Sequence, residues 1–173
     1  MFAWKSPEQV ITLEGFPQSS PGAPCPALFA TEHSLAVVFH LYTPNPNWDG
    51  TSVRVIDVNS EREPIAVVTF DHPSIHTFGP PNDEAFSGHP LASKGLKPYG
   101  AFEVIHSRWI HQLEKMNSVH PCHNREKFLA GKRHFILTFH DSTFECIAHN
   151  YKIDYPKCTI SQAIQSHVNT VNA

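Results

Sequence analysis

Short apolar runs separated by turn-forming residues predict a set of strands in the first two-thirds of the chain. The runs that favour strand are rich in β-branched and aromatic residues and cover residues 27–30, 35–43, 52–58, 65–70 and 101–105. The first two runs flank the polar tripeptide Glu32-His33-Ser34, so we expect them to pair as a hairpin.

Two stretches around these strands carry mixed or irregular signals. The tetrapeptide Ser6-Pro7-Glu8-Gln9 is typical of a helix start, because serine can cap, proline suits the first helical position and glutamine can complete a capping box. Residues 10–13 favour strand, but we expect a short helix here, within an irregular arm over residues 1–26. Residues 71–98, which are rich in proline and glycine, predict a long loop.

Helical periodicity is concentrated in the C-terminal half. Ser107 is placed to cap a helix over residues 108–117, whose apolar residues fall on one face. A second short helix is expected over residues 124–130, with Gly131 ending it in the left-handed conformation that glycine tolerates. The tetrapeptide Thr159-Ile160-Ser161-Gln162 matches a capping box and predicts a C-terminal helix.

This arrangement predicts an α+β fold. We expect a single globular domain over residues 1–173, with a mainly antiparallel sheet and two or three helices concentrated in the C-terminal half. The chain has 173 residues, 40% of them hydrophobic, which is enough to bury a core without a metal or a disulfide. A regular βαβ alternation and a glycine-rich phosphate loop are both missing, so no parallel α/β fold is predicted.

Residues 134–140 and 143–151 form the clearest hairpin in the sequence. A two-residue turn at Asp141-Ser142 pairs Phe139 with Phe144 and makes one face of the hairpin wholly apolar. We expect that face to pack on the core, and the polar face to be free for other contacts.

The polar face of this hairpin carries the candidate catalytic residues, His140, Glu145 and Asp141. In the predicted register His140 lies diagonal to Glu145 at roughly 7–8 Å. A carboxylate can orient an imidazole and raise its pKa, and a His–Glu couple is a usable general base. The alternative is structural, because Asp141 suits a turn through local hydrogen bonds and His140 can be a buried residue with a backbone partner.

Histidine is abundant, with 13 residues, and four of them are weaker candidates for a metal site. His134 and His149 face each other in the predicted register, with Cβ atoms about 4.5–5.5 Å apart, and could share a metal given a third ligand. His72 and His76 are four residues apart, but the intervening proline disfavours the helix that would bring them together. None of these residues closes a four-ligand set, so we expect no bound metal and no cofactor.

Charge and cysteine content narrow the expected partners. The net charge is −3, from 13 basic and 16 acidic residues without a block of either sign, so nucleic acid is not an expected partner. No apolar stretch approaches the roughly 18 residues that span a bilayer, and the N-terminus lacks the pattern of a secretory signal. We therefore expect a soluble cytoplasmic protein whose four cysteines, which have no CxxC spacing, are thiols.

The sequence carries no recognisable catalytic signature, since neither Gly-x-Ser-x-Gly nor His-Glu-x-x-His occurs. The leading hypothesis is a binding or interaction module that uses its sheet and its long loop to hold a small molecule or a protein. The alternative is a general-base or metal-dependent enzyme with a site around His140 and Glu145.

Overall fold

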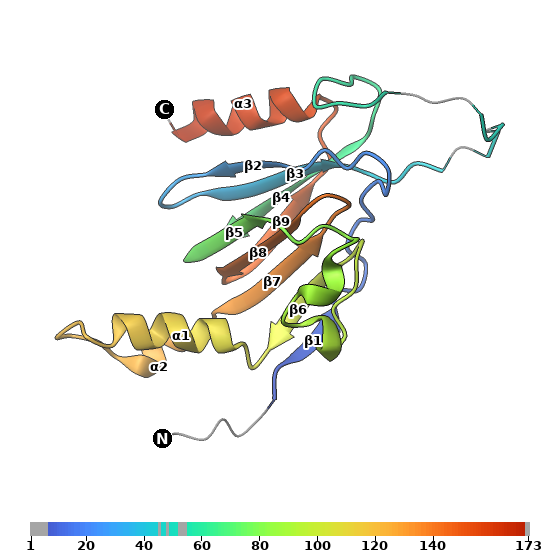
Figure 1. Ribbon diagram of the computed structural model, residues 1–173. Helices are drawn as coiled ribbons and strands as arrows, with labels where there is room; N and C mark the ends of the chain where they lie inside the picture. Colours follow the sequence, from blue (N-terminus) through green and yellow to red (C-terminus); the bar gives the residue numbers. More distant parts are fainter. Residues whose placement is uncertain (1–6, 45, 48, 52–54, 172–173) are drawn as a thin grey trace. The chain divides into compact units, whose positions relative to one another are not determined.

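The computed structural model describes residues 7–44, 46–47, 49–51 and 55–171 (Figure 1). Its elements, in chain order, are β1 (Gln9–Thr12), β2 (Ala27–Ala30), β3 (Leu35–His40), β4 (Ile65–Asp71), β5 (Ile75–Gly79), the 3-10 helices η1 (Phe86–Gly88) and η2 (Ala92–Lys94), β6 (Ala101–Ile105), α1 (Arg108–Asn117), α2 (Arg125–Leu129), β7 (Arg133–Thr138), β8 (Thr143–Ala148), β9 (Asn150–Asp154) and α3 (Ile160–Val171).

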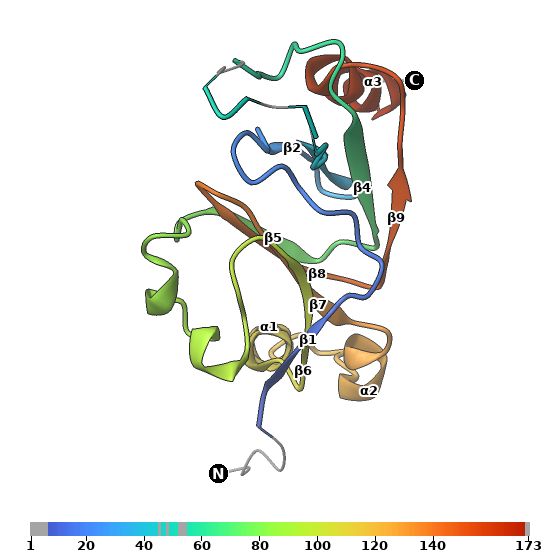
Figure 2. The same cartoon turned by 90° about the vertical axis from the view of Figure 1, so that its right-hand side faces the viewer.

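These elements form two antiparallel sheets in two compact units, which confirms the α+β prediction. Unit 1, Met1–Phe16 with His72–Asn150, holds the sheet β1-β6-β7-β8-β5 and the helices α1 and α2. Unit 2, Pro17–Asp71 with Tyr151–Ala173, holds the sheet β2-β3-β4-β9, with α3 packed on β2 and β3 (Figures 1 and 2). That all 173 residues fold as one cooperative domain stays a prediction.

Most of the local predictions are confirmed. The hairpin β2–β3 pairs Ala30 with Leu35, and β4 and β6 form where the sequence predicts them. Ser107 caps α1 by accepting from the backbone N–H of Ile110 at 3.3 Å. The capping box of α3 is formed in both directions: the N–H of Gln162 donates to Thr159 Oγ1 at 3.2 Å, and that of Thr159 donates to Gln162 Oε1 at 2.9 Å.

Two element predictions are wrong. The expected N-terminal helix is the strand β1, because Val10 packs into the core cluster of unit 1 and β1 pairs along β6. Ser6, its expected cap, lies outside the described residues. The expected strand over residues 52–58 is not formed at Val55–Val58, where Val55 is exposed, and the preceding three positions lie outside the described residues.

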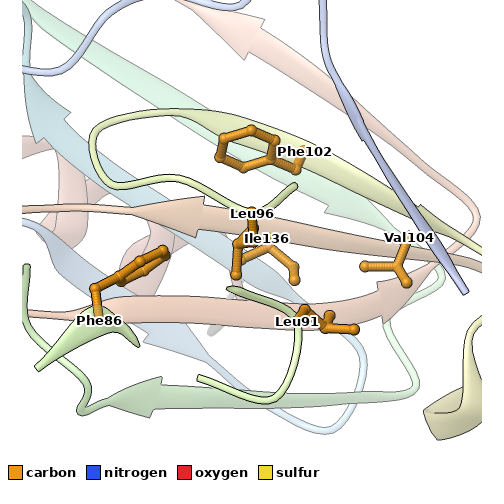
Figure 3. Close-up of a cluster of buried hydrophobic side chains, with 6 residues drawn as sticks. All are labelled: Phe86, Leu91, Leu96, Phe102, Val104 and Ile136. Carbon is orange, nitrogen blue, oxygen red and sulfur yellow. The ribbon is translucent and has the colours of Figure 1, made fainter. Parts of the chain in front are cut away.

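The predicted loop over residues 71–98 contains regular structure. It holds β5, which pairs with β8 from Ile75↔Ile147 to Gly79↔Thr143. The rest of it belongs to the covering segment, which we define as residues 80–99, including η1 and η2. Figure 3 shows how this segment packs on the sheet of unit 1. The buried cluster consists of Phe86, Leu91 and Leu96 from the covering segment and Phe102, Val104 and Ile136 from β6 and β7.

The hairpin β7–β8 has the predicted faces but a different register. Its turn holds four residues, 139–142, with the N–H of Phe139 donating to Ser142 O at 2.8 Å, and Thr138 pairs with Thr143. Each residue pairs two positions away from its predicted partner, so every side chain keeps its face while its partner changes. Consequently His134 pairs with Ile147, and the predicted pairing of His134 with His149 is wrong.

Candidate functional site

The polar face of the β7–β8 hairpin is buried under the covering segment. Thr138 Oγ1 donates to Lys97 O at 2.9 Å, and Thr143 Oγ1 donates to Pro81 O at 2.9 Å. Since the side chains of both faces are buried, the expectation that only the apolar face meets a core is wrong. The hydroxyls of these two buried threonines both donate to carbonyl oxygens of the covering segment, and these hydrogen bonds help to hold that segment on the hairpin.

Glu145 accepts hydrogen bonds from two buried histidines on this face. His89 Nε2, from the covering segment, is 3.2 Å from Glu145 Oε1, and His134 Nε2, from β7, is 2.9 Å from Oε2. The side chains of the two histidines are 5% and 3% exposed, whereas that of Glu145 is 21% exposed. We call these three residues, with Ser107, the Glu145 centre.

The second nitrogen of each imidazole sets its tautomer. Nδ1 of His89 accepts from the N–H of Leu91 at 3.1 Å, so the proton of the neutral ring is on Nε2 and points at Glu145. Nδ1 of His134 is 2.9 Å from Ser107 Oγ, whose hydroxyl can donate to it. A metal needs an unprotonated nitrogen, which His89 can offer at Nε2 only by losing the Leu91 bond. Among the described residues, no three His, Cys, Asp or Glu side chains form a group suited to a metal.

The order Ser107–His134–Glu145 is also that of the hydrogen bonds in a catalytic triad. Ser107, however, is only 2% exposed, and its oxygen already accepts from the N–H of Ile110 as the cap of α1. A nucleophile must reach its substrate, so this geometry indicates a structural network that joins α1, β7, β8 and the covering segment.

The ionisation of Glu145 fits this structural role. Burial by itself raises the pKa of the carboxyl, but the hydrogen bonds from His134 and His89 outweigh it and lower the pKa to about 2. Both carboxylate oxygens are therefore charged acceptors with donors in place, and the predicted couple between His140 and Glu145 does not form. That either residue takes part in catalysis stays a prediction.

His140 lies in the turn and belongs to a separate cluster, formed with Asp83 and Tyr99 of the covering segment. His140 Nδ1 is 2.9 Å from Asp83 Oδ2, and the hydroxyl of Tyr99 donates to that same oxygen. The Tyr99 hydroxyl is also 2.9 Å from His140 Nδ1. The imidazole is 42% exposed, and its Nε2 is 3.9 Å from Oδ1 of the exposed Asp141. We call Asp83, Tyr99 and His140 the His140 cluster.

The charges of the His140 cluster couple its three groups. The hydrogen bond and the charge of Asp83 raise the pKa of His140 against the effect of burial, with smaller contributions from Asp141 and Glu84. The Tyr99 hydroxyl is the largest cause of the lowered pKa of Asp83. In return, its bond to Asp83 raises the pKa of Tyr99 to about 12. The cluster therefore holds a carboxylate, a neutral phenol and an imidazole that favours its protonated form.

The four weaker metal candidates have different surroundings. His134 belongs to the Glu145 centre, whereas His72 and His149 stack with ring centroids 4.9 Å apart and an interplanar angle of 19°. His76 lies on β5 opposite Cys146. The structure thus separates His134 from His149 and pairs His149 with His72, a contact that the sequence did not predict.

The covering segment supplies the site residues that the sequence analysis missed. Asp83, His89 and Tyr99 all lie in it, and its residues follow no helical or strand period. The only sequence signal for them is that ionisable side chains recur among its prolines and glycines, which is typical of a functional loop as well as of a solvated one.

Comparison of the chain with protein-family models, curated proteins and solved structures gave no match. Within the described part of the chain, no helix has both the length and the apolar character needed to cross a bilayer.

Proposed function

We propose that the protein is a binding module whose recognition site is the His140 cluster of unit 1. One observation carries the proposal: the imidazole of His140 is held through Nδ1 by Asp83 and Tyr99, while its side chain is half-exposed and its Nε2 lies beside Asp141. An anchored polar group on a rigid support favours recognition because it loses little freedom when a ligand binds.

The ligand we propose is a small molecule or a protein side chain that carries a hydrogen-bond acceptor next to a donor. Protonated His140 offers a donor at Nε2, and Asp141 offers a carboxylate acceptor 3.9 Å away. Primary amides and hydroxyl-rich molecules carry such an acceptor next to a donor. Nucleic acid is a poor fit, because the acidic residues near His140 repel phosphate.

We also propose that the protein acts in the cytoplasm with reduced cysteines. Its four cysteines form no disulfide, and Cys122 is exposed. An exposed thiol stays reduced in a reducing compartment, whereas in an oxidising compartment it is open to disulfide formation.

Ligand-observed NMR against a library of small amides, polyols and short peptides tests the binding proposal. Binders should lose affinity at least severalfold in His140→Ala and in Tyr99→Phe. His33→Ala is the matched control, because that imidazole is exposed beside Glu32 in the β2–β3 turn. The proposal fails if no library member binds, or if its binders are indifferent to His140→Ala.

A second candidate function is general-base catalysis at the same imidazole. The specific observation is the Asp83–His140 pair, in which a carboxylate orients the ring through Nδ1 and leaves Nε2 for proton transfer. NMR spectra of each binder incubated with the protein distinguish the two functions. Chemical conversion that is lost in His140→Ala indicates catalysis, and unchanged ligand indicates binding alone.

A further inference from the structure

Cys25 and His40 lie on adjacent segments of unit 2. The β2–β3 ladder pairs Ala27 with Val38, and beyond its end the N–H of His40 donates to Pro24 O at 2.8 Å. Cys25 and Ala27 both pack against the buried cluster that includes Val38, and His40 shares a face of β3 with Val38 because it is two positions further along that strand. The two side chains are therefore on the same side of the sheet.

The thiol and the imidazole also reach the same dipeptide, Ile56-Asp57. The thiol of Cys25 donates to Ile56 O with Sγ at 3.6 Å, and His40 Nε2 donates to Asp57 O at 2.9 Å. These two oxygens belong to consecutive peptide units, so the sulfur and the ring that contact them are close neighbours.

His40 keeps a buried nitrogen that makes no hydrogen bond. A carbonyl oxygen can only accept, so the proton of the neutral ring is on Nε2 and Nδ1 carries the basic lone pair. Among the described residues Nδ1 has no partner, and His40 is only 1% exposed. A buried acceptor without a donor destabilises a fold, so this nitrogen calls for an explanation beyond packing.

We propose that Cys25 is a thiol that reacts with small peroxides, and that His40 Nδ1 is the base that takes its proton. A thiolate is the reactive form of cysteine, and a thiol beside a histidine base is a recurrent nucleophile. Cys25 is half-buried, so hydrogen peroxide can reach its sulfur while bulky electrophiles are hindered. The site lies in unit 2 and does not rest on the binding function proposed for unit 1.

The reaction balances with hydrogen peroxide as the oxidant. The thiol turns from Ile56 O toward His40 and transfers its proton to Nδ1, which leaves a thiolate beside an imidazolium. The thiolate attacks one peroxide oxygen, so an S–O bond forms and the O–O bond breaks with its electron pair on the departing hydroxide. That hydroxide takes the proton from Nδ1. The sulfur is oxidised to a sulfenic acid, the peroxide is reduced to water, and His40 returns to its neutral form.

Trapping of sulfenic acids in the full chain tests the proposal. The protein is treated with hydrogen peroxide in an excess of dimedone, and mass spectrometry of its peptides gives the rate of adduct formation at each cysteine. Cys158 is the matched control, because it is half-buried and packs against the same cluster as Cys25. We expect Cys25 to react about tenfold faster than Cys158 and also faster than the exposed Cys122.

His40→Gln separates the base from its structural role. The glutamine amide can still donate to Asp57 O but has no basic nitrogen, so the variant should slow Cys25 by about tenfold and leave Cys122 unchanged. Because His40 is buried, circular dichroism checks that the variant is folded. The wild-type protein unfolded in urea gives a second measurement that needs no variant: the rate at Cys25 should fall to that at Cys158, because the base is no longer beside the thiol.

The results that would overturn the proposal are equally specific. One is a Cys25 rate in the folded protein no higher than that of Cys158. Another is a rate advantage of Cys25 that survives unfolding in urea, and a third is a folded His40→Gln variant in which Cys25 reacts as fast as in the wild type.

Discussion

Glu145→Gln tests whether the Glu145 centre is a structural network. The amide has nearly the shape of the carboxyl group but only one acceptor oxygen, which must serve His89, because the N–H of Leu91 fixes that ring with its proton on Nε2. The amide nitrogen then faces His134, which can accept from it by moving its proton to Nδ1, since the hydroxyl of Ser107 can accept as well as donate. The variant therefore keeps its hydrogen bonds and loses the negative charge.

The magnitude of this loss follows from the pKa of Glu145. The folded structure lowers it from an ordinary 4.5 to about 2, with the burial cost already included. At about 1.4 kcal/mol per pKa unit, the charged form stabilises the fold by about 3 kcal/mol. Because the folded-state pKa is the lower one, this stabilisation is complete above the unfolded-state value near 4.5 and is lost as the pH falls toward 2.

Urea unfolding of both proteins, followed by tryptophan fluorescence, provides the measurement. Glu145→Gln should lose about 3 kcal/mol of unfolding free energy at about pH 7, and the difference between the two proteins should shrink to a small remainder as the pH falls to about 2, where the wild-type carboxyl is half protonated in the folded state. Glu32→Gln, a change at an exposed residue beside His33, should leave the unfolding free energy unchanged at both pH values. An equal loss at both pH values, or no loss at neutral pH, would refute the network.

Four further experiments test other parts of the structure. Phe144→Ala should cost about 3–5 kcal/mol because its ring is fully buried, and a loss no larger than that of the half-exposed Phe78→Ala would contradict the core assignment. Thr159→Ala should cost about 1 kcal/mol by removing the cap of α3; an unchanged unfolding curve would show that the cap is dispensable. His140→Ala should leave the melting temperature nearly unchanged, since the Tyr99 bond to Asp83 remains, and a clear drop would assign His140 a structural role. Elemental analysis should find no stoichiometric zinc, and one zinc per chain would contradict the assignment of the histidines.

Three predictions that depend on a few neighbouring residues match the structure. The cap at Ser107 and the capping box at Thr159 and Gln162 satisfy backbone groups within four residues, so their chemistry is visible in the sequence. Gly131 likewise follows α2 with a φ of +73°. Each of these features needs no information about distant parts of the chain.

The strands β1 and β5 were not predicted because their partners are distant in sequence. β1 pairs with β6 and β5 with β8, more than sixty residues away in each case. At β1 the helix-start pattern of residues 6–9 misleads, whereas the strand preference of residues 10–13 agrees with the ladder to β6 and with the burial of Val10. At β5 the surrounding prolines and glycines concealed a short strand whose pairing only the fold supplies.

The covering segment contributes residues to the candidate site, and it determines which side chains of the β7–β8 hairpin a ligand can reach. Alternation along the two strands assigns His134 and Glu145 to one face in either register, but it does not show whether that face is wet or covered. The covering segment closes over Glu145 with His89 and leaves His140 half-exposed at the turn. Glu145 already accepts from a buried histidine on each oxygen, so its charge serves the network that holds the covering segment. His140 can meet a ligand with every hydrogen bond of its cluster intact, so recognition on this hairpin is expected there.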